Sequence, residues 1–112
     1  MLTPAEVRQF IEGRTVFAFD PAMRKPAAVV TYGTEGRCAM RMVSGETDQG
    51  RYGFDADCYW TRYDTFRGGQ THAFRLERLG PGVVQAWFAT GTRAFVQSHD
   101  AKPTAWPDLP QG

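Results

Sequence analysis

The densest group of residues able to bind a ligand lies between residues 59 and 67, where four aromatic rings and two arginines fall within nine residues. Alternate side chains of a strand share a face, so Trp60 and Arg62 point the same way. A buried arginine is costly unless it is paired or faces water, so an inward Arg62 would lie at a barrel mouth or in a polar cavity. We therefore expect an aromatic pocket with Arg62 as cationic anchor, suited to an anionic amphiphile such as a fatty acid. In the alternative, Tyr63 and Arg62 only cover a rim of the sheet with their apolar parts.

Few side chains suited to catalysis or to metal binding are present. Cys38 and Cys58 both fall on apolar faces of expected strands, as buried thiols do. In a simple meander one strand separates the two cysteines, so they lie too far apart for a disulfide. Another strand order would allow a disulfide between them. Two histidines, His72 and His99, cannot form a three-histidine zinc site. We expect no catalytic residue, no metal site and no cofactor.

The acidic residues around the fourth expected strand suggest turns rather than a cation site. Asp55 and Asp57 stand two apart, as calcium ligands can, but the remaining spacing of an EF-hand loop is missing. We expect Glu46, Asp48 and their neighbours to lie in solvated turns, where carboxylates accept hydrogen bonds from nearby backbone amides.

Length and charge limit the classes of protein. A chain of 112 residues is enough for one domain. A net charge of +1 without basic clusters argues against nucleic-acid binding, and no apolar run reaches the roughly 18 residues of a membrane span. The first residues lack the apolar stretch of a signal peptide, so the sequence as written predicts a cytoplasmic protein, and a periplasmic one if a leader preceded Met1.

The N-terminal residues predict a short helix over residues 4–12. Thr3 is a suitable N-cap, and Glu6, three residues later, completes a capping box. Val7 and Phe10, together with Ile11, have the spacing of one apolar helix face. A helix this short is unstable alone, so this face must pack on the rest of the domain.

The rest of the chain alternates between apolar and polar residues, with glycine- and proline-containing turns between the alternating runs. This pattern predicts an all-β fold: a small antiparallel meander barrel, or a strongly curled sheet, of about eight strands, with the helix closing one end. Residues 1–98 would form this single domain, and residues 99–112 a proline-rich tail. The expected strands cover residues 14–20, 27–32, 37–43, 51–54, 58–63, 72–79, 83–90 and 93–97.

The order of several short motifs resembles a family of small bacterial β-rich domains of unknown function. The resemblance spans residues 2–97 and implies a lipocalin-like fold without catalytic residues. The motifs that carry it are Leu2–Glu6, Gly13-Arg14-Thr15, Tyr32–Gly36, Gly50-Arg51-Tyr52, Cys58-Tyr59-Trp60 and Phe74.

A barrel of this size either fills itself with side chains or holds one small ligand. We expect a non-enzymatic binder of a small apolar or amphipathic molecule. The alternative is a filled barrel that binds a protein partner, or a second copy of itself in a homodimer, through Tyr59, Tyr63 and Phe66. The expected ligand-binding residues, beside the anchor Arg62, are Phe17, Phe19, Met40, Met42, Tyr52, Trp60, Phe74 and Trp87.

Overall fold

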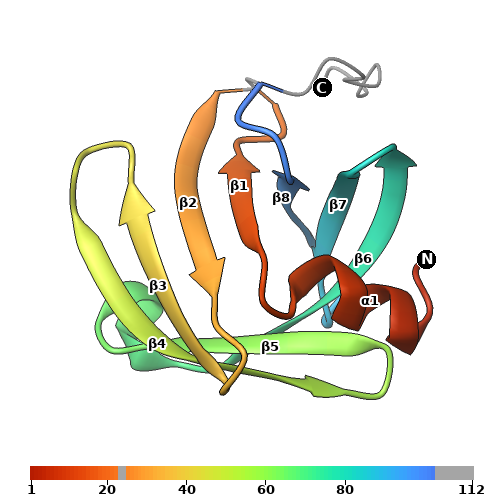
Figure 1. The fold of residues 1–112 in the computed structure, drawn as a ribbon, viewed down its shortest axis with the longest axis horizontal. Helices are drawn as coiled ribbons and strands as arrows, with labels where there is room; N and C mark the ends of the chain where they lie inside the picture. The colour runs from red at the N-terminus through yellow and green to blue at the C-terminus, as the bar shows by residue number, and fades with distance from the viewer. Residues whose placement is uncertain (23–24, 103–112) are drawn as a thin grey trace.

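The computed structural model describes residues 1–22 and 25–102, which form a closed antiparallel barrel of eight strands with one short helix (Figure 1). Each strand pairs with the next along the chain, and β1 pairs with β8 to close the barrel. The expectation of an all-β meander barrel with an N-terminal helix is therefore confirmed. The strands are β1 (Thr15–Phe19), β2 (Pro26–Tyr32), β3 (Arg37–Met42), β4 (Thr47–Asp55), β5 (Cys58–Tyr63), β6 (His72–Gly80), β7 (Val83–Phe88) and β8 (Arg93–Ser98).

Helix α1 (Pro4–Ile11) begins at the expected capping box. The Thr3 hydroxyl accepts from the Glu6 amide at 3.3 Å, and the Glu6 carboxylate accepts from the Thr3 amide at 2.9 Å. Three buried side chains, Val7, Phe10 and Ile11, join the main core of the barrel. The expected docking face of the helix is therefore the face that packs.

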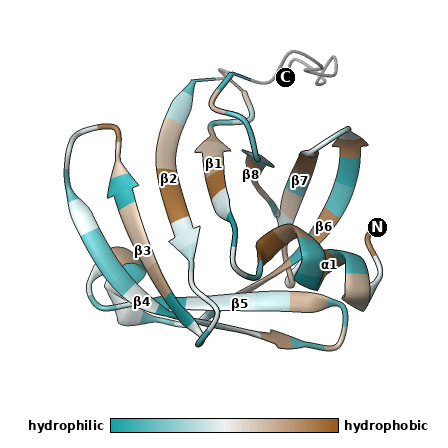
Figure 2. Ribbon diagram, viewed as in Figure 1, coloured by the Kyte–Doolittle hydropathy of each residue, from teal (hydrophilic) through white to brown (hydrophobic). Residues whose placement is uncertain are grey.

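Hydrophobic and hydrophilic residues alternate along the strands, as the bands along β6 illustrate (Figure 2). In β6, Phe74 and Leu76 are fully buried in the main core, while Arg75 and Glu77, which alternate with them, are half-buried. This period of two is what a strand with one face in the barrel core requires.

Strand β4 is longer than expected, because it begins at Thr47 rather than at residue 51. Asp48 is therefore a strand residue that pairs with Met40, and its expected place in a solvated turn is wrong. Gly50 lies so close to β5 that an added Cβ would be 2.1 Å from the Arg62 carbonyl oxygen. Backbone pairing with β3 and β5 holds the polar start of this strand. Because such pairing does not require apolar side chains, the sequence shows no hydrophobic alternation there.

The two cysteines lie on strands separated by β4, as a meander requires. Cys38 in β3 pairs with Gly50, and Cys58 in β5 pairs with Asp55. Both are buried free thiols, and burial raises the pKa of Cys38 to about 11. Burial also raises the pKa of Cys58, so both thiols favour the protonated form over the reactive thiolate at neutral pH.

The segment after β8 lies only partly within the described residues. His99 stacks on Phe10 of α1 with ring centroids 4.0 Å apart, and its Nε2 lies 3.0 Å from the Phe10 carbonyl oxygen. The start of the expected tail is thus packed on the helix. The remainder of that tail, residues 103–112, falls outside the described residues.

A cationic pocket at the open end of the barrel

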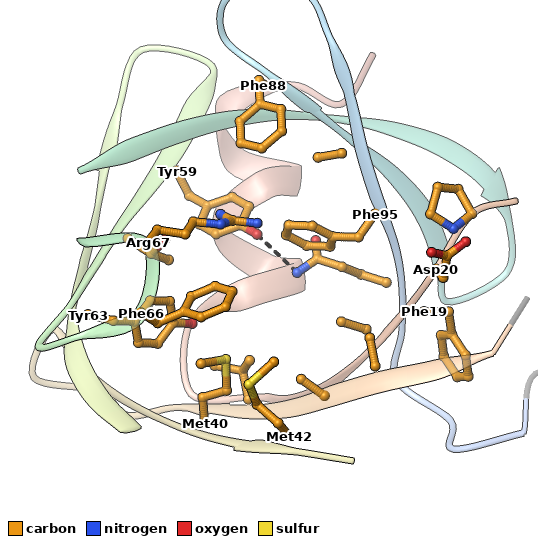
Figure 3. Close-up of a pocket in the computed structure, with 18 of the residues that line it drawn as sticks. Phe19, Asp20, Met40, Met42, Tyr59, Tyr63, Phe66, Arg67, Phe88 and Phe95 are labelled. Carbon is orange, nitrogen blue, oxygen red and sulfur yellow. Dashed lines mark hydrogen bonds between the residues drawn. The ribbon is translucent and has the colours of Figure 1, made fainter. Parts of the chain in front are cut away.

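A cavity of about 300 Å³ occupies the end of the barrel away from α1. Strand β1 leaves α1 at Thr15 and reaches the cavity at its far end, with Ala18 and Phe19, and the ribbon of α1 lies behind the pocket in Figure 3. Most of the wall is apolar. The lining side chains drawn and labelled in Figure 3 are Phe19, Asp20, Met40, Met42, Tyr59, Tyr63, Phe66, Arg67, Phe88 and Phe95.

Arg67 places a guanidinium among aromatic rings in this cavity. Its Cζ lies 5.0 to 5.7 Å from the centroids of four phenyl rings, and Figure 3 shows the side chain reaching across Tyr59 toward the centre of the pocket. No hydrogen bond or ion pair joins this guanidinium to a side chain within residues 1–22 and 25–102. Rings attract a cation but do not replace the hydrogen bonds it had in water. The four rings belong to Phe66, Phe74, Phe88 and Phe95.

Desolvation lowers the pKa of Arg67, and the neighbouring tyrosines act in the opposite direction. Burial raises the pKa values of Tyr32, Tyr59 and Tyr63, so these hydroxyls are neutral at physiological pH. They supply dipoles to the site and no compensating negative charge. The pocket therefore carries a cation without an anion from its inner wall.

The backbone of Arg67 is itself in a rare conformation. Arg67 belongs to the 3-10 turn η1 (Phe66–Gly69), with φ of 57° and ψ of 35°, followed by Gly68 and Gly69 at φ of 66° and 69°. The left-handed region costs a residue with a Cβ roughly 1–2 kcal/mol, which glycine avoids. A strained residue that also points a charge into a cavity is a candidate functional residue.

Asp48 fixes the turn that carries Arg67. Its Oδ2 accepts from the Phe66 amide at 2.8 Å, from the Thr65 amide at 3.1 Å and from the Thr65 hydroxyl at 3.0 Å. These hydrogen bonds, the one from Phe66 first, lower the pKa of Asp48. Strand β4 thus holds η1 through one carboxylate, seventeen or eighteen residues away in the chain.

Gln97 supplies a second polar group to the cavity. Its Nε2 donates to the Tyr59 hydroxyl oxygen at 3.0 Å, drawn as the dashed line in Figure 3. The side chain is 1% exposed, and its Oε1 has no hydrogen-bond partner among the described residues. A buried acceptor without a donor is uncommon in proteins and costs free energy.

Only some of the expected ligand-binding residues line this cavity. Met40 and Met42 form part of its wall, and Phe19 lies at its edge. Phe74 is fully buried and does not line the cavity. Its ring contacts Arg67, whose Cζ lies 5.4 Å from the ring centroid of Phe74. Tyr52 is buried beside Tyr32, and its hydroxyl donates to the Gly33 carbonyl oxygen, away from the cavity wall. Phe17 packs in a separate apolar cluster with Phe19, Val83 and Val96.

The inward face of β5 is the opposite of the one expected. Tyr59, Thr61 and Tyr63 are buried, whereas Arg62 is exposed and does not line the cavity. Trp60 lies over Gly53 of β4, where an added Cβ would be 2.7 Å from the indole ring. Because this glycine accommodates the large ring, Trp60 lies outside the pocket. Arg62, two residues later in the same strand, lies on the same outer face.

Trp87 is also outside the cavity. Its Nε1 donates to the Glu77 carboxylate at 3.0 Å, and the Arg93 guanidinium lies 5.5 Å from its ring centroid. An indole N–H needs a partner when half-buried, and Glu77 on the neighbouring strand supplies one.

The sequence reasoning missed the residues that give the pocket its polarity, Arg67 and Gln97. Arg67 is the last residue of the aromatic run and directly precedes Gly68-Gly69, in the gap between the expected strands 58–63 and 72–79. An arginine directly before two glycines, at the end of an aromatic run, is the sequence signal that could have found it. Gln97 had no such signal.

Comparison of the chain with protein-family models, with curated proteins and with solved structures gives no match. The lipocalin-like resemblance therefore stays a prediction. No helix among the described residues is long and apolar enough to cross a membrane. Within the same residues, no three His, Cys, Asp or Glu side chains gather in a way that could hold a metal ion.

Proposed function

We propose that the barrel binds a small amphipathic molecule in the cavity at its open end. The observation that carries the proposal is Arg67, a desolvated guanidinium without an anionic partner at the wall of an apolar cavity of about 300 Å³. Pockets for small molecules begin at about this volume and combine apolar walls with a few polar groups. A bound molecule would fill the apolar space and pair with the polar groups.

The alternative function, a filled barrel that binds a protein partner or a second copy of itself, has less support. It requires Tyr59, Tyr63 and Phe66 to be exposed, but Tyr59 and Tyr63 are buried inside the barrel and Phe66 is half-buried at the cavity wall. The exposed large apolar side chains among the described residues, Met1 and Val43, belong to the N-terminus and to the turn after β3.

Methionine methyl groups offer a direct test of binding. With 13C-labelled methionine methyls, addition of neutral 1-octanol or of octanoate should shift the Met40 and Met42 signals and leave Met1, which is 70% exposed, in place. Native mass spectrometry of freshly purified protein adds a second readout, a mass lost on denaturation. If neither molecule shifts Met40 or Met42 and no mass is lost, the proposal is wrong.

A cavity-filling pair of variants supplies the control. Ala28 lines the cavity, whereas Ala39 is exposed on β3. Ala28→Phe should remove the methionine shifts, because its ring takes the space of the ligand, and Ala39→Phe should keep them. Loss of binding in both variants would show that the cavity is not the site.

A further inference from the structure

We propose, on the basis of that function, that the ligand is a medium-chain carboxylic acid whose carboxylate pairs with Arg67. The proposal concerns the charge and the length of the ligand. Both follow from the cavity, and each can fail while binding of some amphipathic molecule stands.

The charge of the ligand follows from the charged groups around the cavity. Arg67 lies among four phenyl rings, and the tyrosines beside it are neutral. The other charged residues that line the cavity, Asp20 and Arg93, are exposed at its mouth. Asp20 already accepts from the Ala22 amide at 2.9 Å. The inner cavity is therefore cationic, and a bound anion would remove the cost of a desolvated guanidinium.

The guanidinium favours a carboxylate among anions. Two parallel N–H groups of arginine match the two oxygens of a carboxylate. Arg67 is half-buried and carries a single positive charge, which balances one negative charge, whereas an alkyl phosphate dianion would leave one charge uncompensated beside phenyl rings. The unpartnered Oε1 of Gln97 also argues against a ligand crowded with oxygen acceptors.

The length of the ligand follows from the volume. At about 30 Å³ for each water-sized group, a cavity of about 300 Å³ holds roughly ten non-hydrogen atoms. Octanoate has that size, with its three carboxylate atoms at Arg67 and its chain along the apolar wall. Met40 and Met42 belong to this wall, and their flexible side chains can close around an unbranched chain.

The proposed negative charge of the ligand is tested by comparing a charged and a neutral ligand in proteins that carry a charged or a neutral residue at position 67. We expect wild-type protein to bind octanoate at least tenfold more tightly than 1-octanol in calorimetric titrations. Arg67→Met should lower octanoate affinity tenfold or more and leave 1-octanol affinity within about threefold. Arg62→Met, which removes an exposed arginine from the outside of β5, should change neither affinity by more than about twofold.

Two results would overturn the proposed charge: equal affinities of wild-type protein for octanoate and 1-octanol, or unchanged octanoate affinity in Arg67→Met. If Arg67→Met does not fold, Arg67→Gly gives the same test, because glycine accepts the backbone angles of this position. Tighter binding of octyl phosphate than of octanoate would overturn the choice of carboxylate. Binding of 1-octanol without preference for octanoate leaves the proposed function intact, whereas absence of binding by both contradicts that function itself.

The length is tested with unbranched acids of six to twelve carbons. Each buried methylene should raise affinity about fourfold, so octanoate should bind about fifteenfold more tightly than hexanoate. Beyond eight to ten carbons the gain should fall below about threefold in total, because the added groups remain in water. A constant gain up to twelve carbons, or none between six and eight, would overturn the proposed length.

Discussion

The two ends of the barrel are built in opposite ways. At the α1 end, Val7 and Ile11 are almost fully buried in the core, and the helix start is satisfied by a reciprocal capping box. At the η1 end, Arg67 combines a left-handed backbone with a desolvated charge, and Gln97 has an unpartnered acceptor. Buried side chains and a capping box mark one end, whereas a strained residue and an unpartnered acceptor mark the other.

This difference shows how a small barrel can combine stability with a binding site. Strain and unpaired polar groups cost free energy, so they persist only where the surrounding structure holds them in place. Here Asp48 holds η1 from β4, and Val7 and Ile11 at the α1 end belong to the main core without lining the cavity. The substitutions below are expected to separate the two ends.

The largest effect should come from the closed end. Ile11 is fully buried, so Ile11→Ala should lower the free energy of unfolding by about 3 kcal/mol through lost burial and the cavity that remains. Urea denaturation measures this change. Val43→Ala, at a side chain 68% exposed, is the control and should stay within about 0.5 kcal/mol of wild type. A cost below about 1 kcal/mol for Ile11→Ala would show that the helix contributes little to the fold.

A smaller effect should follow from releasing η1. Asp48→Asn keeps an acceptor but loses the charge that strengthens its three contacts to Thr65 and Phe66, so we expect a loss of about 1.5 kcal/mol. Octanoate affinity should fall as well, because Arg67 follows directly after Phe66. Asp64→Asn, at an exposed carboxylate directly before Thr65, should change neither the free energy of unfolding nor the octanoate affinity. Loss of stability with unchanged octanoate affinity would separate Asp48 from the pocket.

The same carboxylate predicts a dependence on pH. The pKa of Asp48 in the folded protein is lower than its ordinary value of 3.8, so its ionised form stabilises the fold. This contribution is complete above pH 3.8 and is lost as the pH falls through the lower folded-state pKa. The stability difference between wild type and Asp48→Asn should therefore stay constant from about pH 7 down to about pH 4 and shrink below that in urea titrations. A difference that does not change with pH would contradict the role of the charge.

The smallest effect should appear at Arg67 itself. Arg67→Gly and Arg67→Ala remove the same charge and the same ring contacts, but only glycine accepts the left-handed backbone without strain. We expect Arg67→Gly to be more stable than Arg67→Ala by about 1 kcal/mol in urea denaturation. Both should lose octanoate binding. Equal stabilities would mean that η1 relaxes and stores no strain at this position.

Local patterns in the sequence were sufficient for α1 and for the number and order of the strands, although not for the start of β4 or for η1. The capping box of α1 depends on Thr3 and Glu6, three residues apart, and the strands depend on a period of two. Both signals come from interactions between neighbours in the chain, which any short segment reveals. Short turns between consecutive strands then leave a meander as the simplest arrangement, and the closed barrel is that meander with β1 joined to β8.

Which residues face the cavity was decided only by the tertiary structure. Both faces of β5 carry aromatic side chains, so its period of two fits either orientation, and Gly53 on the neighbouring strand selects the one with Trp60 and Arg62 outside. Arg67 enters the pocket because Asp48, distant in sequence, holds its turn. Such choices depend on contacts between segments that the chain brings together only on folding, which no local pattern encodes.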